Sequence, residues 1–299
     1  MDIMKPVTFA IIGGDLRQQS LADCLAKDGH TVRVFGLEKL PVREPKITLC
    51  TNLTDALANA DCIVAPLPIC DEMLQITTPF SKERISITSL LDGTSRGTIL
   101  FGGKLPQEVI DLAETRGVTT YDYLNREEFA VLNAIPTAEG AIRIAMDELS
   151  VTLDGIRCLV VGYGRIGKLL AHKLKALGAD VTVSARKYSD LAWIRAYGFT
   201  PIETAALDGH LSGFDVIFNT VPLRLFGDHR LSELDESTLC IDLASKPGGF
   251  DLDAAAKHSV RVIWALSLPG KEAPLTAGAI IRGTIVNMLI EYNQTFISG

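Results

Sequence analysis

Three glycines near the middle of the chain have the spacing G-x-G-x-x-G, in the run Gly162-Tyr163-Gly164-Arg165-Ile166-Gly167. The string alone is a weak signal, but its context is complete. An apolar strand pattern over residues 156–162 leads into it, a helical pattern over 166–177 follows, and a second strand pattern spans 180–185. This order predicts the βαβ unit that binds dinucleotides, and it requires a parallel sheet around it.

Each glycine of this loop has a distinct physical task. Gly162 allows the tight turn, Gly164 lets the backbone touch a diphosphate, and Gly167 lets the helix pack close to the strand. The N–H groups at the helix start, from Arg165 and Ile166 onward, would then face the phosphates at the positive end of the helix dipole. The alternative is a plain strand–turn–helix corner without a ligand.

The end of the following strand indicates which nicotinamide cofactor is bound. NAD(H) sites usually place a carboxylate there for the ribose 2′-hydroxyl, whereas this chain has Ser184-Ala185-Arg186-Lys187. Arg186 can fork onto a 2′-phosphate, with Lys187 and Ser184 as further donors, so we expect NADP(H) in preference to NAD(H). Two solvated basic residues in a loop are the alternative. The nicotinamide half is expected beside a later strand end, at Thr220-Val221-Pro222.

The rest of the chain repeats the alternation of strand and helix. Strand patterns over 7–14, 31–36, 61–66, 98–103 and 118–121 precede the glycine loop, and those over 214–220, 238–243 and 260–265 follow it. We therefore predict an α/β protein with two doubly wound parallel-sheet domains, the second a Rossmann dinucleotide-binding domain. The expected divisions are a flavodoxin-like substrate domain at 1–125, a helical connector at 126–150, the Rossmann domain at 151–274, and a final helix at 275–299 that returns to the first domain. Because Pro136 interrupts the connector, two helices are predicted there, over 126–134 and 137–149.

Composition excludes several classes of function. The 299 residues are 47% hydrophobic and carry a net charge of -7, which gives no broad basic surface for nucleic acid. The sequence lacks an apolar run long enough for a membrane span and shows no secretory leader, so a cytoplasmic protein is expected. Its six cysteines have neither C-x-x-C spacing nor a histidine at metal-ligand spacing, and we expect buried thiols and no metal site.

The first strand also ends at two glycines, but the sequence that follows does not match the dinucleotide fingerprint. Asp15 follows Gly13-Gly14 directly and would repel a phosphate at that helix start. One interpretation makes this a substrate-side loop with Arg17 as an anchor for a carboxylate. The other makes Asp15 an ordinary helix N-cap and Arg17 a solvated side chain.

Five separated motifs together resemble the A subunits of bacterial dipicolinate synthase. They are IIGGDLRQ near the amino end, NAIPTAEGAI at 133–142, GYGRIG, DLASKPGG at 242–249, and LPGKEAPLTAG at 268–278. The resemblance spans nearly the whole chain. It implies oxidation of a dihydrodipicolinate to dipicolinate (pyridine-2,6-dicarboxylate) at a nicotinamide site on this subunit, in a branch of the lysine pathway, in the mother cell of a sporulating bacterium; with the basic residues after the second strand, the expected cofactor is NADP. It also implies a partner, the flavoprotein-like B subunit, together with a two-lobed form like that of the D-2-hydroxy acid and alanine dehydrogenases.

The implied reaction suggests roles for particular residues. Removal of a hydride and a proton from the ring yields an aromatic product, so the protein must orient the ring, accept a proton and hold two carboxylates. Glu139 is the candidate proton acceptor, although an acid in a first helical turn is also ordinary chemistry. Candidate carboxylate anchors are Arg17, Thr137, Ser245, Lys246 and Lys271, and Lys246 is also a candidate catalytic residue.

Two rival functions stay open at the level of sequence. One is an NAD(P)-dependent dehydrogenase of a hydroxy or amino acid, although none of the five histidines has an evident acid–base setting. The other is a nucleotide-binding regulatory subunit without turnover of its own. The apolar final helix permits a homo-oligomer.

Overall fold

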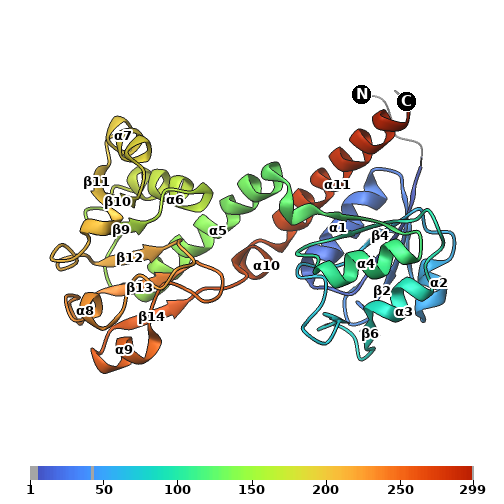
Figure 1. The fold of residues 1–299 in the computed structure, drawn as a ribbon, viewed down its shortest axis with the longest axis horizontal. Coiled ribbons are helices and arrows are strands. Elements are labelled where there is room, and N and C mark those ends of the chain that lie inside the picture. Colours follow the sequence, from blue (N-terminus) through green and yellow to red (C-terminus); the bar gives the residue numbers. More distant parts are fainter. Residues whose placement is uncertain (1–5, 42–43, 298–299) are drawn as a thin grey trace. The chain divides into compact units, whose positions relative to one another are not determined.

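The structure, a computed structural model, describes residues 6–41 and 44–297. It divides into two compact units. The first runs through Leu132 and resumes at Ala273, and the second comprises Asn133–Glu272. Each unit contains one six-stranded, all-parallel sheet with helices on both faces (Figure 1). The predicted α/β class with two doubly wound sheets is confirmed.

The sheet of the first unit has the strand order β3-β2-β1-β4-β7-β8. A short antiparallel pair, β5 with β6, stands beside it. The elements are β1 (Thr8–Ile12), α1 (Leu16–Lys27), β2 (Thr31–Phe35), β3 (Ile47–Leu49), α2 (Leu53–Leu57), β4 (Cys62–Val64), β5 (Gln75–Ile76), β6 (Ile85–Ser86), α3 (Ile87–Asp92), β7 (Ile99–Gly102), α4 (Gln107–Thr115), β8 (Thr119–Asp122), η1 (Tyr123–Asn125), the start of α5 (Glu127–Glu148), and α11 (Pro274–Ile297).

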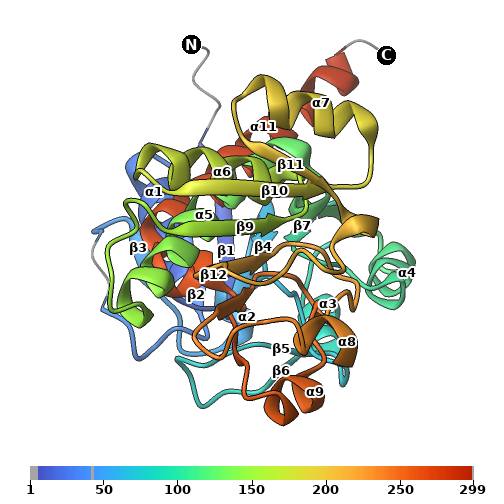
Figure 2. The same cartoon turned by 90° about the vertical axis from the view of Figure 1, so that its left-hand side faces the viewer.

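The sheet of the second unit has the equivalent order, β11-β10-β9-β12-β13-β14. Figure 2 shows β10, β9 and β12 running side by side. The elements are β9 (Arg157–Val161), α6 (Arg165–Ala176), β10 (Asp180–Ala185), α7 (Tyr188–Ala196), β11 (Thr200–Glu203), η2 (Thr204–Ala206), β12 (Val216–Asn219), α8 (Asp228–Leu231), β13 (Leu239–Asp242), α9 (Leu252–Lys257), β14 (Arg261–Trp264) and α10 (Leu268–Glu272). The second half of α5 also belongs to this unit.

Strand alternation explains how both faces of each sheet are buried. In β9, Cys158 and Val160 join the core cluster on one face, while Leu159 and Val161 join the cluster on the other. In β1, Ala10 and Ile12 contribute to one cluster, while Phe9 and Ile11 contribute to a second. Helices must therefore cover both faces, which is why these central strands are mostly apolar.

The register of the second sheet brings four strand ends to one edge. Val161 pairs with Ser184 on one side and with Asn219 on the other, and Asn219 pairs with Asp242. The loops that leave these four strands therefore start at the same carboxyl edge, where open α/β sheets bind their ligands.

The prediction of two helices around Pro136 is wrong. A single helix, α5, runs from Glu127 to Glu148 with Pro136 inside it. Apolar residues on both sides of the proline hold the helix in place: Phe129 in the core of the first unit, and Ala138 and Ala141 in the core of the second. This burial offsets the interior-proline cost of about 3 kcal/mol.

The final helix packs against α1 in the first unit (Figure 1). A Cβ at Gly278 would lie 2.5 Å from the Cβ of Ser20, so the close approach depends on glycine at this position. The Ser20 hydroxyl donates to the Leu275 carbonyl at 2.9 Å, and Arg282 donates to Asp28 at 2.5 Å. Among the described residues, every helix is too short or too polar to span a lipid bilayer.

Candidate dinucleotide site

The glycine loop between β9 and α6 has the geometry that its sequence requires. Gly162 has a φ of +102°, in the left-handed region that favours glycine. A Cβ at Gly167 would lie 2.0 Å from the Gly162 carbonyl oxygen, so the helix crosses the loop at a distance that excludes any side chain. At Gly164, by contrast, an added Cβ would meet nothing within 4 Å, so the backbone here faces open space.

The start of α6 presents backbone donors to that open space. Gly164 is the N-cap residue, and no side chain caps the helix there. The helical ladder begins where the Lys168 amide donates to the Gly164 carbonyl at 2.9 Å. The amides of Arg165, Ile166 and Gly167 precede this bond and form the positive end of the helix dipole, which is a ready site for an anion.

A groove of about 590 Å³ lies over this helix start, within the size range of ligand pockets. Its charged residues are basic except for Asp190, with cations at Arg165, Lys168, Arg186 and Lys187. The complete lining is Gly162, Tyr163, Gly164, Arg165, Lys168, Ala185, Arg186, Lys187, Asp190, Thr204, Thr220, Val221, Pro222, Leu223 and Leu225. The groove therefore joins the glycine loop to the ends of β10, β11 and β12.

Most of the residues predicted for the cofactor meet in this groove, but three do not line it. Gly167 is buried behind the loop, and Ile166 packs against the core cluster. Ser184 is fully buried, with its hydroxyl 3.3 Å from that of Thr204, so it does not offer the predicted donor to the groove. Thr204 lines the groove in its place.

Sequence reasoning missed several lining residues, and helix geometry could have found one of them. Lys168 lies one turn after Gly164, on the face of α6 that looks over the loop, with its ammonium 5.2 Å from the centre of the Tyr163 ring. Thr204 follows β11, whose place beside β10 becomes evident only with the strand order. Tyr163 is buried, and this burial raises the pKa of its hydroxyl.

The candidate substrate residues of the second unit lie on two helices and one loop. Ser245 and Lys246 are exposed in the loop after β13. Glu139, on α5, has a 60% exposed side chain and forms an ion pair with Lys173 at 2.8 Å. Thr137 is buried and donates its hydroxyl to the Asn133 carbonyl at 2.8 Å, which commits that proton to the helix backbone.

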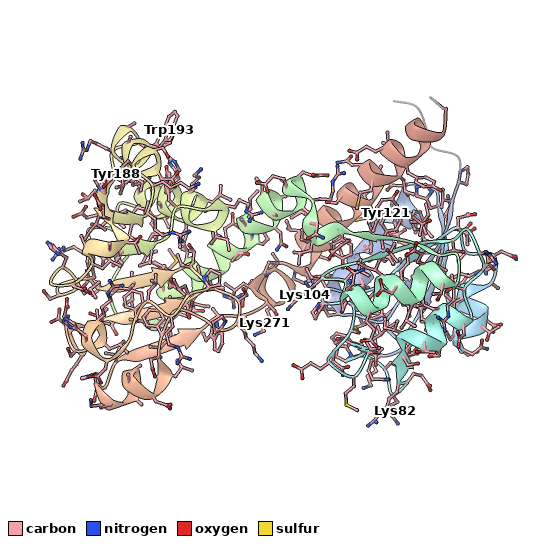
Figure 3. The ribbon with its side chains drawn as sticks, viewed as in Figure 1. Lys82, Lys104, Tyr121, Tyr188, Trp193 and Lys271 are labelled. Atoms are coloured by element: carbon pink, nitrogen blue, oxygen red, sulfur yellow. The ribbon has the colours of Figure 1, made fainter. Side chains whose placement is uncertain are left out.

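Lys271 is exposed on α10, where Figure 3 labels it. This helix packs against α5 at Gly140, where an added Cβ would lie 3.2 Å from the Cβ of Leu268. An ion pair between Arg143 and Glu272 at 2.6 Å links the two helices. The structure thus places Lys271 and Glu139 on adjacent helices of one unit.

Arg17 lies in the first unit, and both sequence interpretations of its loop need adjustment. The N-cap interpretation of Asp15 is confirmed, because its carboxylate accepts from the Arg17 amide in a capping box with Gln18. The expectation of a solvated Arg17 is wrong. Its side chain is 11% exposed, and its guanidinium binds Asp15 at 2.8 Å and the Leu67 carbonyl at 3.0 Å.

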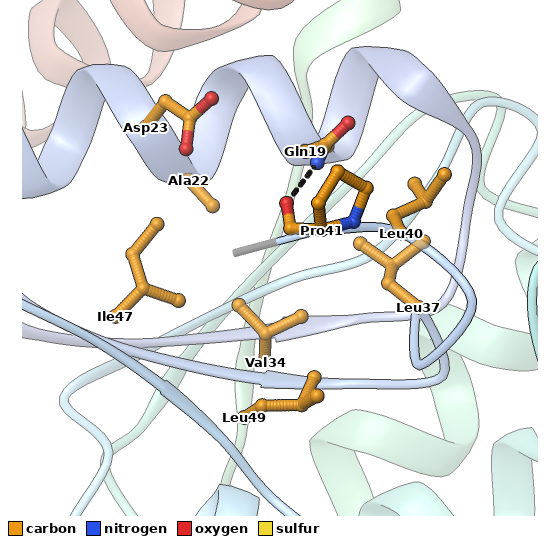
Figure 4. A pocket seen from close by; sticks show the side chains of 9 residues that line it. All are labelled: Gln19, Ala22, Asp23, Val34, Leu37, Leu40, Pro41, Ile47 and Leu49. Carbon is orange, nitrogen blue, oxygen red and sulfur yellow. Dashed lines mark hydrogen bonds between the residues drawn. The ribbon is translucent and has the colours of Figure 1, made fainter. Parts of the chain in front are cut away.

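The glycine pair of the first unit differs from the loop after β9. The Gly14 amide already donates to the Thr77 carbonyl at 2.7 Å, and the Gln18 side chain lies 2.4 Å from where a Gly14 Cβ would be. A mostly apolar cavity between α1 and strands β2 and β3, shown in Figure 4, has a volume of about 20 Å³, enough for one water molecule.

The six cysteines are free thiols, five of them buried. Burial raises the pKa of Cys158 to about 12, so this thiol stays protonated at neutral pH. Within the described ranges, no group of three or more histidine, cysteine or carboxylate side chains gathers as a metal site would require.

Each of the two units matches a different known protein domain. Residues 8–124 match the N-terminal domain of the dipicolinate synthase A subunit, and residues 133–244 match the NAD binding domain of D-isomer specific 2-hydroxyacid dehydrogenases. The second match identifies the groove as part of a nicotinamide dinucleotide domain. The residues fit that ligand, because the open backbone at Gly164 and the uncapped start of α6 supply what a diphosphate needs.

Three relatives extend the likeness to the full chain. The dipicolinate synthase A subunit of Bacillus subtilis (strain 168) is 31% identical over 290 residues, which cover 97% of this chain and 98% of that protein. The crystal structure of the dipicolinate synthase A subunit from Bacillus halodurans is 31% identical, with a TM-score of 0.86 over 95% of this chain and 97% of that chain. An L-alanine dehydrogenase shares the fold alone, at 13% identity and a TM-score of 0.67 over 96% of this chain and 90% of that one. With a matching amino-terminal domain, a nicotinamide dinucleotide domain and full-length identity above 30%, the chain belongs to the family of dipicolinate synthase A subunits.

Proposed function

We propose that this chain binds NADP(H) and oxidises dihydrodipicolinate to dipicolinate as the A subunit of a two-subunit synthase. The observation that carries the proposal is the basic groove over the glycine loop, in a chain whose full length matches that family. Family membership supports the substrate and the partner that we propose, and the basic residues of the groove support the preference for the phosphorylated cofactor.

The preference for NADP(H) rests on the end of β10. In the βαβ unit, the adenosine ribose lies beside the end of the second strand, which is Ala185 here. Arg186 and Lys187 follow it directly and line the groove. A guanidinium can form two parallel hydrogen bonds with a 2′-phosphate. Asp190 is the only carboxylate among the described lining residues, and it lies in the first turn of α7 rather than at the end of β10.

The reaction removes two electrons and two hydrogens from the dihydropyridine ring. A nicotinamide held in the groove would supply the hydride acceptor for this step. The other hydrogen leaves as a proton, and the ring becomes aromatic, which drives the step. In this proposal Glu139 accepts that proton, and Lys246 holds one carboxylate of the ring beside the reacting carbon.

The remaining candidates hold the charges of the substrate. Ser245 and Lys271 offer a hydroxyl and an ammonium from exposed positions. The Nε and one terminal nitrogen of Arg17 donate to Asp15 and Leu67, which fixes the orientation of the guanidinium. In this proposal its other terminal nitrogen donates to a substrate carboxylate. Thr137 is an exception, because its hydroxyl already donates within α5 and has no second proton for a substrate carboxylate.

Family membership also supports the cellular setting that we propose. The chain would act as a homo-oligomer in the cytoplasm of the mother cell during sporulation, together with a flavoprotein-like B subunit. Turnover by the purified chain, compared with turnover by the chain plus a B subunit, tests whether the chain reacts alone or only binds nucleotide for its partner.

Arg186→Asp is the direct test of cofactor choice. Loss of two charge-assisted hydrogen bonds, at about 1.5 kcal/mol each, should weaken NADPH binding by about 150-fold and leave NADH within about threefold. Arg195→Asp makes the same charge change on the exposed surface of α7, outside the groove, and serves as the matched control. Equal losses for NADPH and NADH in Arg186→Asp would refute the assignment of the 2′-phosphate to this residue.

A further inference from the structure

Two neighbouring strands end in buried polar side chains. These lie behind residues 220–225, the segment that we call the groove wall. Asn219 is the last residue of β12 and Asp242 the last of β13, and the sheet register sets them opposite each other. Both are almost completely inaccessible to solvent. The Asn219 amide donates to the Asp242 carboxylate at 2.8 Å.

The other hydrogen bonds of the Asn219 side chain fix the start of the groove wall. Its amide nitrogen donates to the Val221 carbonyl at 3.0 Å, and its amide oxygen accepts from the Val221 N–H at 3.1 Å. Thr220, Val221 and Pro222 line the groove on the other side of this contact. The conformation of the wall therefore depends on a side chain that does not reach the groove.

Asp242 holds the following loop in the same way. Its carboxylate accepts from the Ala244 amide at 3.1 Å and from the Gly249 amide at 2.7 Å, which closes residues 243–249 into a ring around it. A Cβ at Gly249 would lie 2.1 Å from the Asn219 amide nitrogen, so glycine is needed for this closure. Ser245 and Lys246 lie on the closed loop.

A backbone contact links the wall and the loop a second time. The Gly249 carbonyl accepts from the amides of Leu225 and Phe226, each at 2.9 Å. The rings of Phe226 and Phe250 stack 4.4 Å apart just beyond. Leu225 itself lines the groove, so both ends of the wall are anchored to the loop.

We infer that the Asn219–Asp242 pair is a positioning element that couples the nucleotide groove to the loop carrying Ser245 and Lys246. Neither side chain of the pair lines the groove or lies on the exposed face of the loop. Its hydrogen bonds nevertheless hold the backbone of the groove wall and of the loop. Filling the groove restrains the wall at 220–225, and the pair transmits this restraint to residues 243–249. Only the link to catalysis rests on the proposed function, because Ser245 and Lys246 on that loop are proposed to bind the substrate.

Hydrogen exchange on the unmodified chain tests this coupling. Addition of NADP+ should slow amide exchange in a peptide spanning residues 243–250, none of which lines the groove. Slowing confined to segments that line the groove would overturn the inference. This measurement needs no variant, so it stands even if changes at the pair prevent folding.

Asp242→Asn tests the role of the pair in binding. An asparagine cannot accept from Ala244, Asn219 and Gly249 at once, so affinity for NADP+ and NAD+ should fall equally, by about tenfold. Adding Asn219→Asp, which restores a donor–acceptor pair in the reverse sense, should recover part of the loss. Asp215→Asn is the matched control, since Asp215 accepts from the Arg157 amide at the opposite edge of the same sheet.

These outcomes separate the inference from the proposed function. Normal affinity for both nucleotides in a folded Asp242→Asn chain would overturn the positioning role and leave the oxidation proposal intact. Failure of the unmodified chain to oxidise dihydrodipicolinate would refute the proposed reaction, whereas affinity and exchange would still report on the pair.

Discussion

Gly164→Val should separate the stability of the chain from its ability to bind nucleotide. Gly164 has extended backbone angles, φ -83° and ψ -164°, which valine adopts readily. A Cβ there would contact nothing within 4 Å. The cost to folding is therefore limited to the poorer N-cap preference of valine, about 1 kcal/mol, and the melting temperature should fall by about 3 °C at most.

The cost to binding should be much larger, because the new side chain occupies the space that the backbone leaves for a diphosphate. If it displaces the phosphates from two helix-start amides, at about 1.5 kcal/mol for each charge-assisted hydrogen bond, the loss is about 3 kcal/mol. This corresponds to a fall in affinity of roughly 150-fold. Titration calorimetry with NADP+, together with thermal unfolding of the same sample, measures both quantities.

The chain offers a matched control at Gly227. This glycine is the N-cap of α8, with φ -92° and ψ -172°, without a side-chain cap, and with nothing within 4 Å of an added Cβ. It lies outside the groove. Gly227→Val should lower the melting temperature to a similar extent and leave affinity unchanged. Normal NADP+ affinity in Gly164→Val would refute the assignment of the diphosphate to this loop.

Two further changes test the packing of each unit. Gly167→Ala should destabilise the second unit by about 3 kcal/mol, measured by denaturant unfolding, because its Cβ would lie 2.0 Å from the Gly162 oxygen and α6 would have to move away. An unchanged midpoint would contradict the close helix–strand approach. In the first unit, His30 is buried against Phe9 and its Nδ1 accepts from the Val7 amide. This burial lowers the pKa of His30 below the unfolded value of about 6.5. The unfolded chain then binds the proton first, so stability should fall as pH drops below that value, and His30→Gln should flatten this part of the melting-temperature profile.

The features of the site that follow from local geometry could be predicted from the sequence. The G-x-G-x-x-G spacing fixes a strand, a turn and a helix in a single arrangement, and Gly162, Gly164, Arg186 and Thr220 all line the groove as expected. The β-branched runs likewise predict the two parallel sheets, since strands buried on both faces must be apolar throughout.

The predictions that proved wrong concern residues whose conformation is set by tertiary packing rather than by local sequence. The last three residues of β10 are all buried, so alternation could not show that the Ser184 hydroxyl turns toward Thr204 and away from the groove. At Pro136 the local rule predicted a helix break, but buried alanines after it keep α5 continuous. The environment of Arg17 depends on Leu67, a residue fifty positions away, which local patterns do not register.

The groove over Gly162–Gly167 is proposed to hold a nicotinamide dinucleotide, with the phosphorylated form preferred. Titration calorimetry of the purified chain with NADP+ and with NAD+ tests this proposal most directly. We expect one molecule bound per chain, tighter binding of NADP+, and displacement of either cofactor by the other. The absence of measurable binding with both nucleotides would contradict it.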